Sequence, residues 1–281
     1  MQTQQEVVES SSQRNIDMFA AIKFGFTRTF KNARYWLLFS LLTMLVMALG
    51  LAGIVGPELA KISANPNATS MDSSISWITI ISYLIMIPVA IFFSIISVRQ
   101  SFREMYRTQP DNNNAMQQNQ GARWNTMTQD IAWGKIILTY LLTSVITGLL
   151  GGIVGGIIGL IFTLFMNGTA SIGLTILFTI ISIVLYALII AFSIMIGYAV
   201  YFATDPETNT TISPVDCVKA SYNAVKPHFW GVFGFNIILA LIVGVIAIFT
   251  LGLGMIIAYP AVVIAQAHMF RQIAGLYAPV E

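Results

Sequence analysis

Six long apolar stretches follow one another along the chain, separated by polar segments. Their approximate bounds are residues 35–56, 75–98, 136–166, 170–203, 229–250 and 252–270. Each reaches or approaches the roughly 20 residues that a helix needs to cross the hydrocarbon core of a bilayer. The stretches are apolar on every face, whereas the strands of a transmembrane barrel alternate between two faces. The pattern therefore predicts an all-α integral membrane protein with six transmembrane helices.

The segment 15–34, before the first span, has the pattern of an amphipathic helix. Its apolar face carries Phe19, Ile22, Phe26, Phe30 and Ala33. Arg28 lies on the opposite face, while Lys23 and Arg34 flank the apolar stripe, where their aliphatic stems can snorkel. This arrangement predicts an interfacial helix lying on the cytoplasmic leaflet.

The segment 213–227 repeats this arrangement before the fifth span. Phe229-Trp230 follows it as Tyr35-Trp36 follows the first segment, and aromatic pairs of this kind suit the headgroup level of a membrane. Ser213 is the expected helix N-cap, with Asp216 at the capping-box position. We therefore expect a second interfacial helix over residues 213–227.

The amino-acid composition indicates that these stretches lie in a lipid bilayer. Hydrophobic residues are 56% and charged residues 9% of the 281 residues, and a soluble chain of that length would expose too much apolar surface to water. Residues 1–14 are polar and predict a disordered tail. Residues 108–120 predict a flexible cytoplasmic linker. The rest of the chain, residues 15–281, is expected to form a single membrane domain.

Basic residues are distributed unevenly between the two sides of the predicted membrane. Of 14 Lys and Arg, thirteen fall on one side of a six-span arrangement and only Lys61 falls on the other. The positive-inside rule then places both termini in the cytoplasm. The residues expected to contact anionic lipid headgroups or an acidic partner are Lys23, Arg28, Lys31, Arg34, Arg99, Arg103, Arg107, Lys219 and Lys226.

The third span carries two interleaved glycine series at four-residue spacing. These are Gly148, Gly152 and Gly156, and Gly151, Gly155 and Gly159. Such spacing leaves a groove without side chains, in which a neighbouring helix can approach closely in lipid. We expect residues 170–203 to fill most of this groove, so that Gly152→Leu or Gly155→Leu disrupts the fold. A substrate path or a seam with a partner protein is the alternative.

The hairpin formed by the third and fourth spans is longer than a bilayer requires. Residues 136–166 and 170–203 contain no charge, and each as a continuous helix would be roughly 45–50 Å long. The hydrocarbon core is only about 30 Å thick. Three outcomes stay open: both helices tilt, they bend at the glycines, or the tip at Asn167-Gly168-Thr169 protrudes and needs a partner.

The predicted spans contain no Asp, Glu, Lys or Arg. Ionisable residues within a membrane mark proton relays, ion pathways and voltage sensors, so their absence argues against an ion-coupled pump or a charge-ring channel. Asn236, Gln266 and His268 remain as polar candidates, expected to hydrogen-bond across helices or, as the alternative, to contact substrate. Pro88 and Pro260 are expected to kink their helices, with a hinge as the alternative at Pro260.

The sequence offers no motif for chemistry. It contains no nucleophile and base at catalytic spacing, no phosphate-binding loop and no set of metal ligands. We therefore expect no enzymatic activity, cofactor, metal or nucleic-acid partner.

The last part of the chain resembles a known group of proteins. An amphipathic helix with lysines is followed by Phe229-Trp230, an apolar span, Gly252-Leu-Gly254, Tyr259-Pro260 and the run Ala265-Gln-Ala267-His-Met-Phe270-Arg271. Residues 213–275 in this order resemble uncharacterised bacterial multi-span membrane proteins related to the membrane domain of glycerophosphoryl diester phosphodiesterases. The resemblance implies a prokaryotic cytoplasmic-membrane protein of about six spans. It implies no catalytic or binding residue, and the chain has no phosphodiesterase domain.

These features favour a non-enzymatic scaffold or accessory subunit that packs against membrane lipids and a membrane protein partner. The alternative is a transporter or flippase for a neutral, zwitterionic or lipid-like substrate. That alternative predicts a polar cavity near mid-membrane that contains Asn236 or the Thr and Ser residues of the third and fourth spans. An intramembrane enzyme ranks third.

Overall fold

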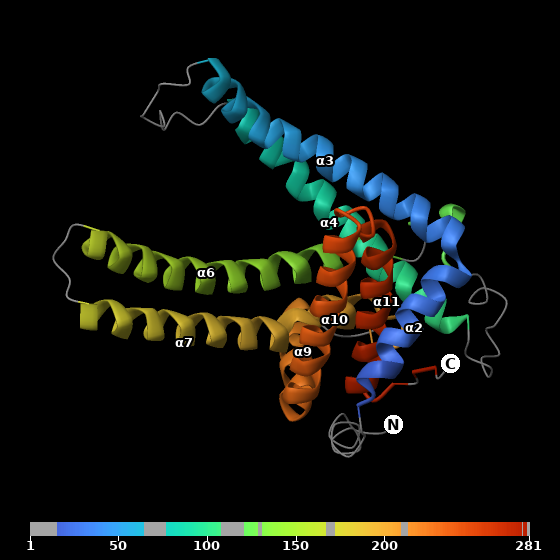
Figure 1. Cartoon of the computed structure of the whole chain (residues 1–281). Coiled ribbons are helices and arrows are strands. Elements are labelled where there is room, and N and C mark those ends of the chain that lie inside the picture. The colour runs from blue at the N-terminus through green and yellow to red at the C-terminus, as the bar shows by residue number, and fades with distance from the viewer. Residues whose placement is uncertain are drawn as a thin grey trace. The chain divides into compact units, whose positions relative to one another are not determined.

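The computed structural model describes residues 16–64, 77–107, 121–128, 131–166, 172–208, 213–276 and 278–279. The described residues are almost entirely helical, with no strand among them (Figure 1). The prediction of an all-helical fold is confirmed. The tail 1–14, the linker 108–120 and the hairpin tip at Asn167-Gly168-Thr169 lie outside the described residues.

Five stretches of the described residues are long and apolar enough to cross a membrane, which supports a membrane protein. They are Ala33–Pro57, Trp77–Tyr106, Trp133–Leu160, Ile176–Thr204 and Pro214–Phe249. The sixth predicted span, 252–270, corresponds to α11 (Met255–Ile273), which is not among the five. Polar residues in its second half, Gln266, His268 and Arg271, lower the mean hydropathy of this helix. Six spans therefore remain a prediction.

The described helices belong to two compact units. The first unit consists of Met1–Met18, Ala132–Ile238 and Met269–Ala278. The second consists of Phe19–Ile131, Leu239–His268 and Pro279–Glu281. Each unit thus combines one long segment of the chain with shorter segments from near its end.

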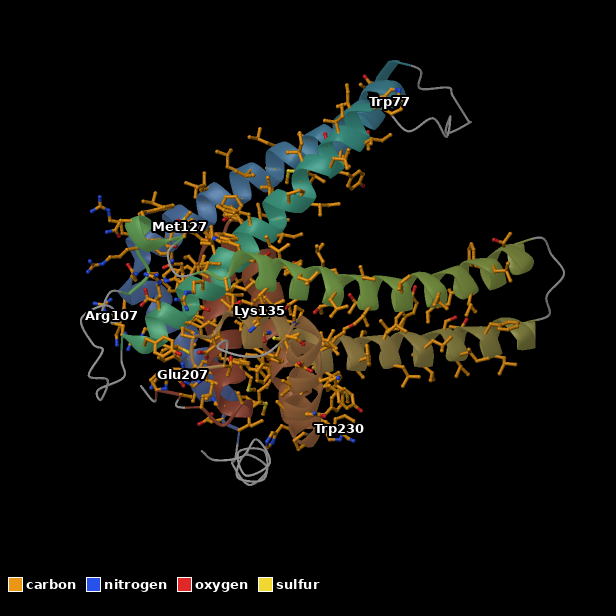
Figure 2. The ribbon with its side chains drawn as sticks, turned by 180° about the vertical axis from the view of Figure 1, so that it is seen from behind. Trp77, Arg107, Met127, Lys135, Glu207 and Trp230 are labelled. Carbon is orange, nitrogen blue, oxygen red and sulfur yellow. The ribbon has the colours of Figure 1, made fainter. Side chains whose placement is uncertain are left out.

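The first unit is built on the antiparallel pair α6 (Trp133–Met166) and α7 (Ile172–Gly197), which run side by side in both views (Figures 1 and 2). The short helix α8 (Ala199–Thr204) follows, and α9 (Pro214–Val225) packs against α6, α7 and α8. The Ser221 hydroxyl on α9 donates to the Met195 carbonyl oxygen at 2.7 Å. The helix η2 (Lys226–His228) leads into α10 (Phe229–Phe249).

The predicted start of a helix at Ser213 is confirmed. Ser213 is the N-cap of α9 and its hydroxyl oxygen accepts from the backbone N–H of Asp216. The same hydroxyl donates to the Asp216 carboxylate at 2.7 Å. This reciprocal pairing satisfies a backbone donor that the first helical turn leaves without a partner.

The second unit contains α2 (Met18–Lys31), α3 (Ala33–Ala64), α4 (Trp77–Tyr106), the short helix η1 (Trp124–Thr126), the end of α10 and most of α11. The helices α3 and α4 pack along each other, and Trp77 and Arg107 lie at opposite ends of α4 (Figure 2). A Cβ atom at Gly50 would meet the Met86 side chain, and one at Gly53 would meet the Ser82 hydroxyl. These glycines permit the close approach of α3 to α4.

The described helices run unbroken through three prolines. Pro57 lies inside α3, which continues to Ala64 instead of ending near residue 56 as the sequence predicted. Pro88 lies inside α4 and Pro260 inside α11. Neighbouring helices and side-chain hydroxyls satisfy freed backbone groups in such helices, so proline does not end them.

The predicted apolar face of α2 is not the face that the protein buries. Phe19 and Phe30 are 67% and 60% exposed, whereas Phe24, outside the predicted stripe, is buried against His268 with ring centroids 4.7 Å apart. Next to it, a Cβ atom at Gly25 would meet the carbonyl oxygen of Ala261 on α11. The helix α2 therefore has two apolar faces, one packed on α11 and one available to lipid.

Candidate functional site

The glycine face of α6 is open in the structure. A Cβ atom built at any of Gly148, Gly151, Gly152, Gly155, Gly156 and Gly159 meets nothing within 4 Å among the described residues. The prediction that residues 170–203 fill most of this groove is therefore wrong for the described part of α7, although the two helices are neighbours. Within α6 the helix is unbroken at all six glycines, so no helix break takes up its excess length.

Threonines continue this face toward the start of α6. Thr139, Thr143 and Thr147 precede Gly151 at the same four-residue spacing. Each hydroxyl donates to the carbonyl oxygen four residues earlier, at 2.9, 2.8 and 2.9 Å respectively. Their polar groups are satisfied within the helix, so the face presents small, apolar groups to whatever lies against it. The spacing was visible in the sequence, but the prediction considered the glycines alone.

A pocket of about 230 Å³ lies in the second unit, between α3, α4 and α11. Its walls contain three methionines and several hydroxyl groups but no charged side chain. The lining residues are Ser40, Thr43, Met44, Met47, Ala90, Phe93, Ser94, Met255 and Tyr259. Neither Asn236 nor any residue of α6 or α7 belongs to this pocket, so it is not the cavity that the transporter hypothesis predicted.

Most hydroxyl groups in or beside the pocket have protein partners. Thr43 donates to the Phe39 carbonyl oxygen at 2.8 Å, and Ser97 donates to the Phe93 carbonyl oxygen at 2.7 Å. Because a serine hydroxyl has one proton, Tyr259 must be the donor in its 2.8 Å hydrogen bond with Ser97.

Ser40 differs from these residues. It is fully buried, and its hydroxyl has no hydrogen-bond partner among the described residues. Buried polar groups without a partner are uncommon in native proteins and require an explanation.

An aromatic cluster lies beside the pocket and corrects the interpretation of Tyr35-Trp36 as markers of the headgroup level. Both side chains are buried, with exposures of 3% and 0%. Tyr35 stacks on Phe39, with centroids 5.8 Å apart, and lies 5.3 Å from the Trp124 ring. Phe39 in turn contacts Phe93, which lines the pocket. The aromatic pair thus supports the pocket wall from inside the protein.

The predicted basic surface is only partly on the surface. Arg28 is buried and its guanidinium carbon lies 5.3 Å from the Phe24 ring centroid, a cation–π contact instead of the predicted exposed position. Arg99 is also buried, and Arg103 is half-buried. The exposed members of the predicted set are Lys23, Lys31, Arg34, Arg107, Lys219 and Lys226. These six remain candidates for contact with lipid headgroups or an acidic partner.

Glu104, near the end of α4, is a buried polar residue that the sequence pattern did not single out. Its carboxylate is buried and accepts from the Asn32 side chain at 2.6 Å and from the Ala122 backbone N–H at 2.9 Å. The Asn32 amide also donates to the Ala122 carbonyl oxygen at 3.0 Å. Glu104 therefore joins the end of α4 to the α2–α3 junction and to the segment before η1.

A buried ion pair lies in the first unit. The Arg271 guanidinium, 1% exposed, lies 3.5 Å from the Asp205 carboxylate and 2.9 Å from the Glu207 carboxylate. Glu207 also donates its backbone N–H to Asp205 at 2.9 Å. The ion pair connects the end of α11 to the turn after α8.

The predicted intramembrane polar residues occupy separate places. Asn236 donates to the Val232 carbonyl oxygen of its own helix at 2.8 Å and also bonds the Tyr198 side chain. His268 is buried, its ring contacts the Phe24 ring at a tilted angle, and its Nε2 atom lies 2.8 Å from the Pro279 carbonyl oxygen. Gln266 is half-buried. Among the described residues, no group of three or more His, Cys, Asp or Glu is placed to hold a metal ion.

Comparisons of the chain with protein-family models, with curated proteins and with solved structures found no match. The site must therefore be interpreted from its own geometry.

Proposed function

We propose that this chain is a non-enzymatic scaffold or accessory subunit of a prokaryotic cytoplasmic membrane, with six spans and both termini in the cytoplasm. Its partner is another membrane protein that lies along α6, while exposed basic residues hold anionic lipid headgroups at the cytoplasmic face. The thirteen-to-one distribution of Lys and Arg supports the orientation. The resemblance of residues 213–275 to bacterial multi-span proteins supports the location.

The open small-residue face of α6 is the observation that carries this proposal. Six glycines expose helix backbone over two interleaved series, and no described residue approaches a Cβ atom built at any of them. In lipid, helices associate by close backbone approach, which small residues permit. A helix propensity penalty of about 1 kcal/mol for each glycine relative to alanine makes so long a glycine face expensive unless something uses it.

Site-specific photo-crosslinking in native membranes tests the proposal. A benzophenone amino acid is introduced at Gly152, on the open face, and at Ile153, which is 60% exposed on the same helix. We expect a discrete protein adduct from position 152 and mainly lipid adducts from position 153. Gly155→Leu should abolish the adduct, while Ile157→Leu, the control on the same helix, should leave it. Lipid adducts alone at both positions would contradict a scaffold role for this face.

A second candidate function is transport or flipping of a lipid-like substrate, and the pocket between α3, α4 and α11 favours it. Its walls suit an uncharged, largely apolar molecule. Vesicles reconstituted with the purified chain and a fluorescent phosphatidylcholine should then show accelerated loss of leaflet asymmetry. Equal rates with and without the chain would remove this candidate.

A further inference from the structure

The pocket of the second unit has the composition of a site for an alkyl chain. Three thioether side chains, Met44, Met47 and Met255, line it together with Ala90 and Phe93. Methionine side chains are flexible and polarizable, so they adapt to ligands of irregular or variable shape. With no charged residue in the lining, the bound group must itself be uncharged, because an unpaired charge is costly in an apolar site.

Ser40 supplies the polar feature of this pocket. Serine and threonine in helices often bond the carbonyl oxygen four residues earlier, and Thr43 and Ser97 do so on either side of the pocket. The Ser40 hydroxyl makes no such bond, although it is fully buried. A ligand with a hydrogen-bond acceptor would satisfy it.

The position of Ser40 along α3 shows how far its hydroxyl lies below the headgroup level of the membrane. Arg34 is exposed and charged, so it belongs at the headgroup level. Ser40 lies six residues further along the helix, about 9 Å at 1.5 Å per residue. Met44 and Met47 lie deeper still. This sequence of polar and apolar positions matches a membrane lipid, in which the ester carbonyl groups lie between the headgroup and the alkyl chains.

The geometry points to a binding site for one acyl chain of a membrane diacyl lipid. The ester carbonyl oxygen accepts from the Ser40 hydroxyl, and the first part of the chain lies against Met44, Met47 and Met255. An engineered apolar cavity of about 150 Å³ binds benzene, so about 230 Å³ holds part of one acyl chain. The headgroup and the second chain lie outside the pocket.

Photolabelling with a lipid probe tests this site in the full chain. The protein is reconstituted into vesicles of dialkyl ether phosphatidylcholine, which offers the Ser40 hydroxyl no ester carbonyl group. These vesicles contain a small fraction of a diacyl phosphatidylcholine with a diazirine on one acyl chain. Peptide mass spectrometry compares labelling of Met44 and Met47 with labelling of Leu41 and Leu45, which are 52% and 57% exposed on the same helix. This ratio of pocket labelling to surface labelling cancels differences in reconstitution.

Two changes remove the proposed hydrogen bond from opposite sides. Ser40→Ala removes the donor, and a dialkyl ether version of the probe removes the carbonyl acceptor. Each change alone is expected to lower the labelling ratio about fivefold, the population ratio that one neutral hydrogen bond sustains. Both changes together should lower the ratio no further. Because the Ser40 hydroxyl has no described partner to lose, Ser40→Ala should keep the wild-type thermal unfolding midpoint in detergent.

Two results would overturn the site. Equal ratios for wild type and Ser40→Ala would mean that the hydroxyl bonds a water molecule or the Trp36 carbonyl oxygen instead. Equal ratios for ester and ether probes with the wild-type chain would mean that no carbonyl group is recognised. If Ser40→Ala unfolds early, the ether probe on the wild-type chain still decides between these outcomes.

Discussion

A methyl group at Gly25 is predicted to destabilise the packing of α2 on α11. The Cβ atom of an alanine there would meet the Ala261 carbonyl oxygen and would lie 2.9 Å from the Ala265 Cβ atom. Carbon atoms in contact are normally about 3.5–4.0 Å apart. The obstructing atoms belong to backbone and to a Cβ, so no rotamer change relieves the overlap. The two helices must therefore separate by about 1 Å.

Two opposing terms set the magnitude. Overpacking of a well-packed interface costs about 1–3 kcal/mol, whereas alanine gains about 1 kcal/mol over glycine in a helix. The separation also loosens the contact of Phe24 with His268, whose ring centroids are 4.7 Å apart. We expect a net loss of about 1–2 kcal/mol in the free energy of unfolding.

Unfolding in mixed micelles with increasing dodecyl sulfate measures this loss, and Gly152→Ala is the matched control. A Cβ atom at Gly152 meets nothing within 4 Å among the described residues, so this variant should equal the wild type or gain up to about 1 kcal/mol. If Gly25→Ala is as stable as Gly152→Ala, then α2 does not pack closely on α11 and the reasoning fails.

Three further changes test other contacts by the same unfolding assay. Arg271→Met leaves the buried Asp205 carboxylate without its cation and should cost about 3–5 kcal/mol, whereas Arg271→Lys should cost less; equal losses would mean that the charge is unimportant. Glu104→Ala removes the acceptor of the Asn32 side chain and should lower the free energy of unfolding by about 2 kcal/mol. A variant as stable as the wild type would refute this expectation. Leu251 has φ 52° in the turn after α10, so Leu251→Gly should relieve strain and stabilise by about 0.5–1 kcal/mol; a loss of stability would show that its exposed side chain makes a needed contact.

The helical membrane class was predictable because it depends on composition and on run length alone. A run such as residues 136–166 is apolar on all faces, and no arrangement in water would bury it. The ends of helices were less predictable: the first span was predicted to end near residue 56, but α3 continues through Pro57 to Ala64. In membrane helices, neighbouring helices and side-chain hydroxyls satisfy the backbone groups that a proline frees, so a proline does not by itself mark the end of the helix.

The location of close helix packing was not predictable from glycine spacing. The regular series on α6 stands open, while single glycines at positions 25, 50 and 53 mark the tight contacts. The spacing of glycines in one helix describes only one side of a helix–helix interface. Close packing also depends on the residues of the other helix that face these glycines. Ala261 faces Gly25 and Met86 faces Gly50, and both lie far away in sequence.

Charged residues were assigned to the surface too readily for the same reason. Arg28 lies over Phe24 in the structure, and the buried carboxylate of Glu104 joins three segments that are far apart in the chain. A helical pattern shows which residues share a face, but it does not show which face the rest of the protein covers. In α2, apolar residues occupy both faces, and the prediction assigned the stripe with Phe19 and Phe30 to the membrane without recognising that Phe24, on the other face, packs against the protein.

The Ser40 hydroxyl shows why a binding site in such a protein escapes sequence analysis. Ser and Thr are common in membrane helices, and in the sequence Ser40 is indistinguishable from Thr43 or Ser97. The difference arises only in three dimensions, where Thr43 and Ser97 bond their own helices while Ser40 is buried with no described partner. Since α3, α4 and α11 each provide part of the wall, no single segment carries the signature of the site. A ligand for this pocket must satisfy that one hydroxyl, and the comparison of ester with ether lipids isolates this requirement from the apolar contacts that any alkyl chain would make.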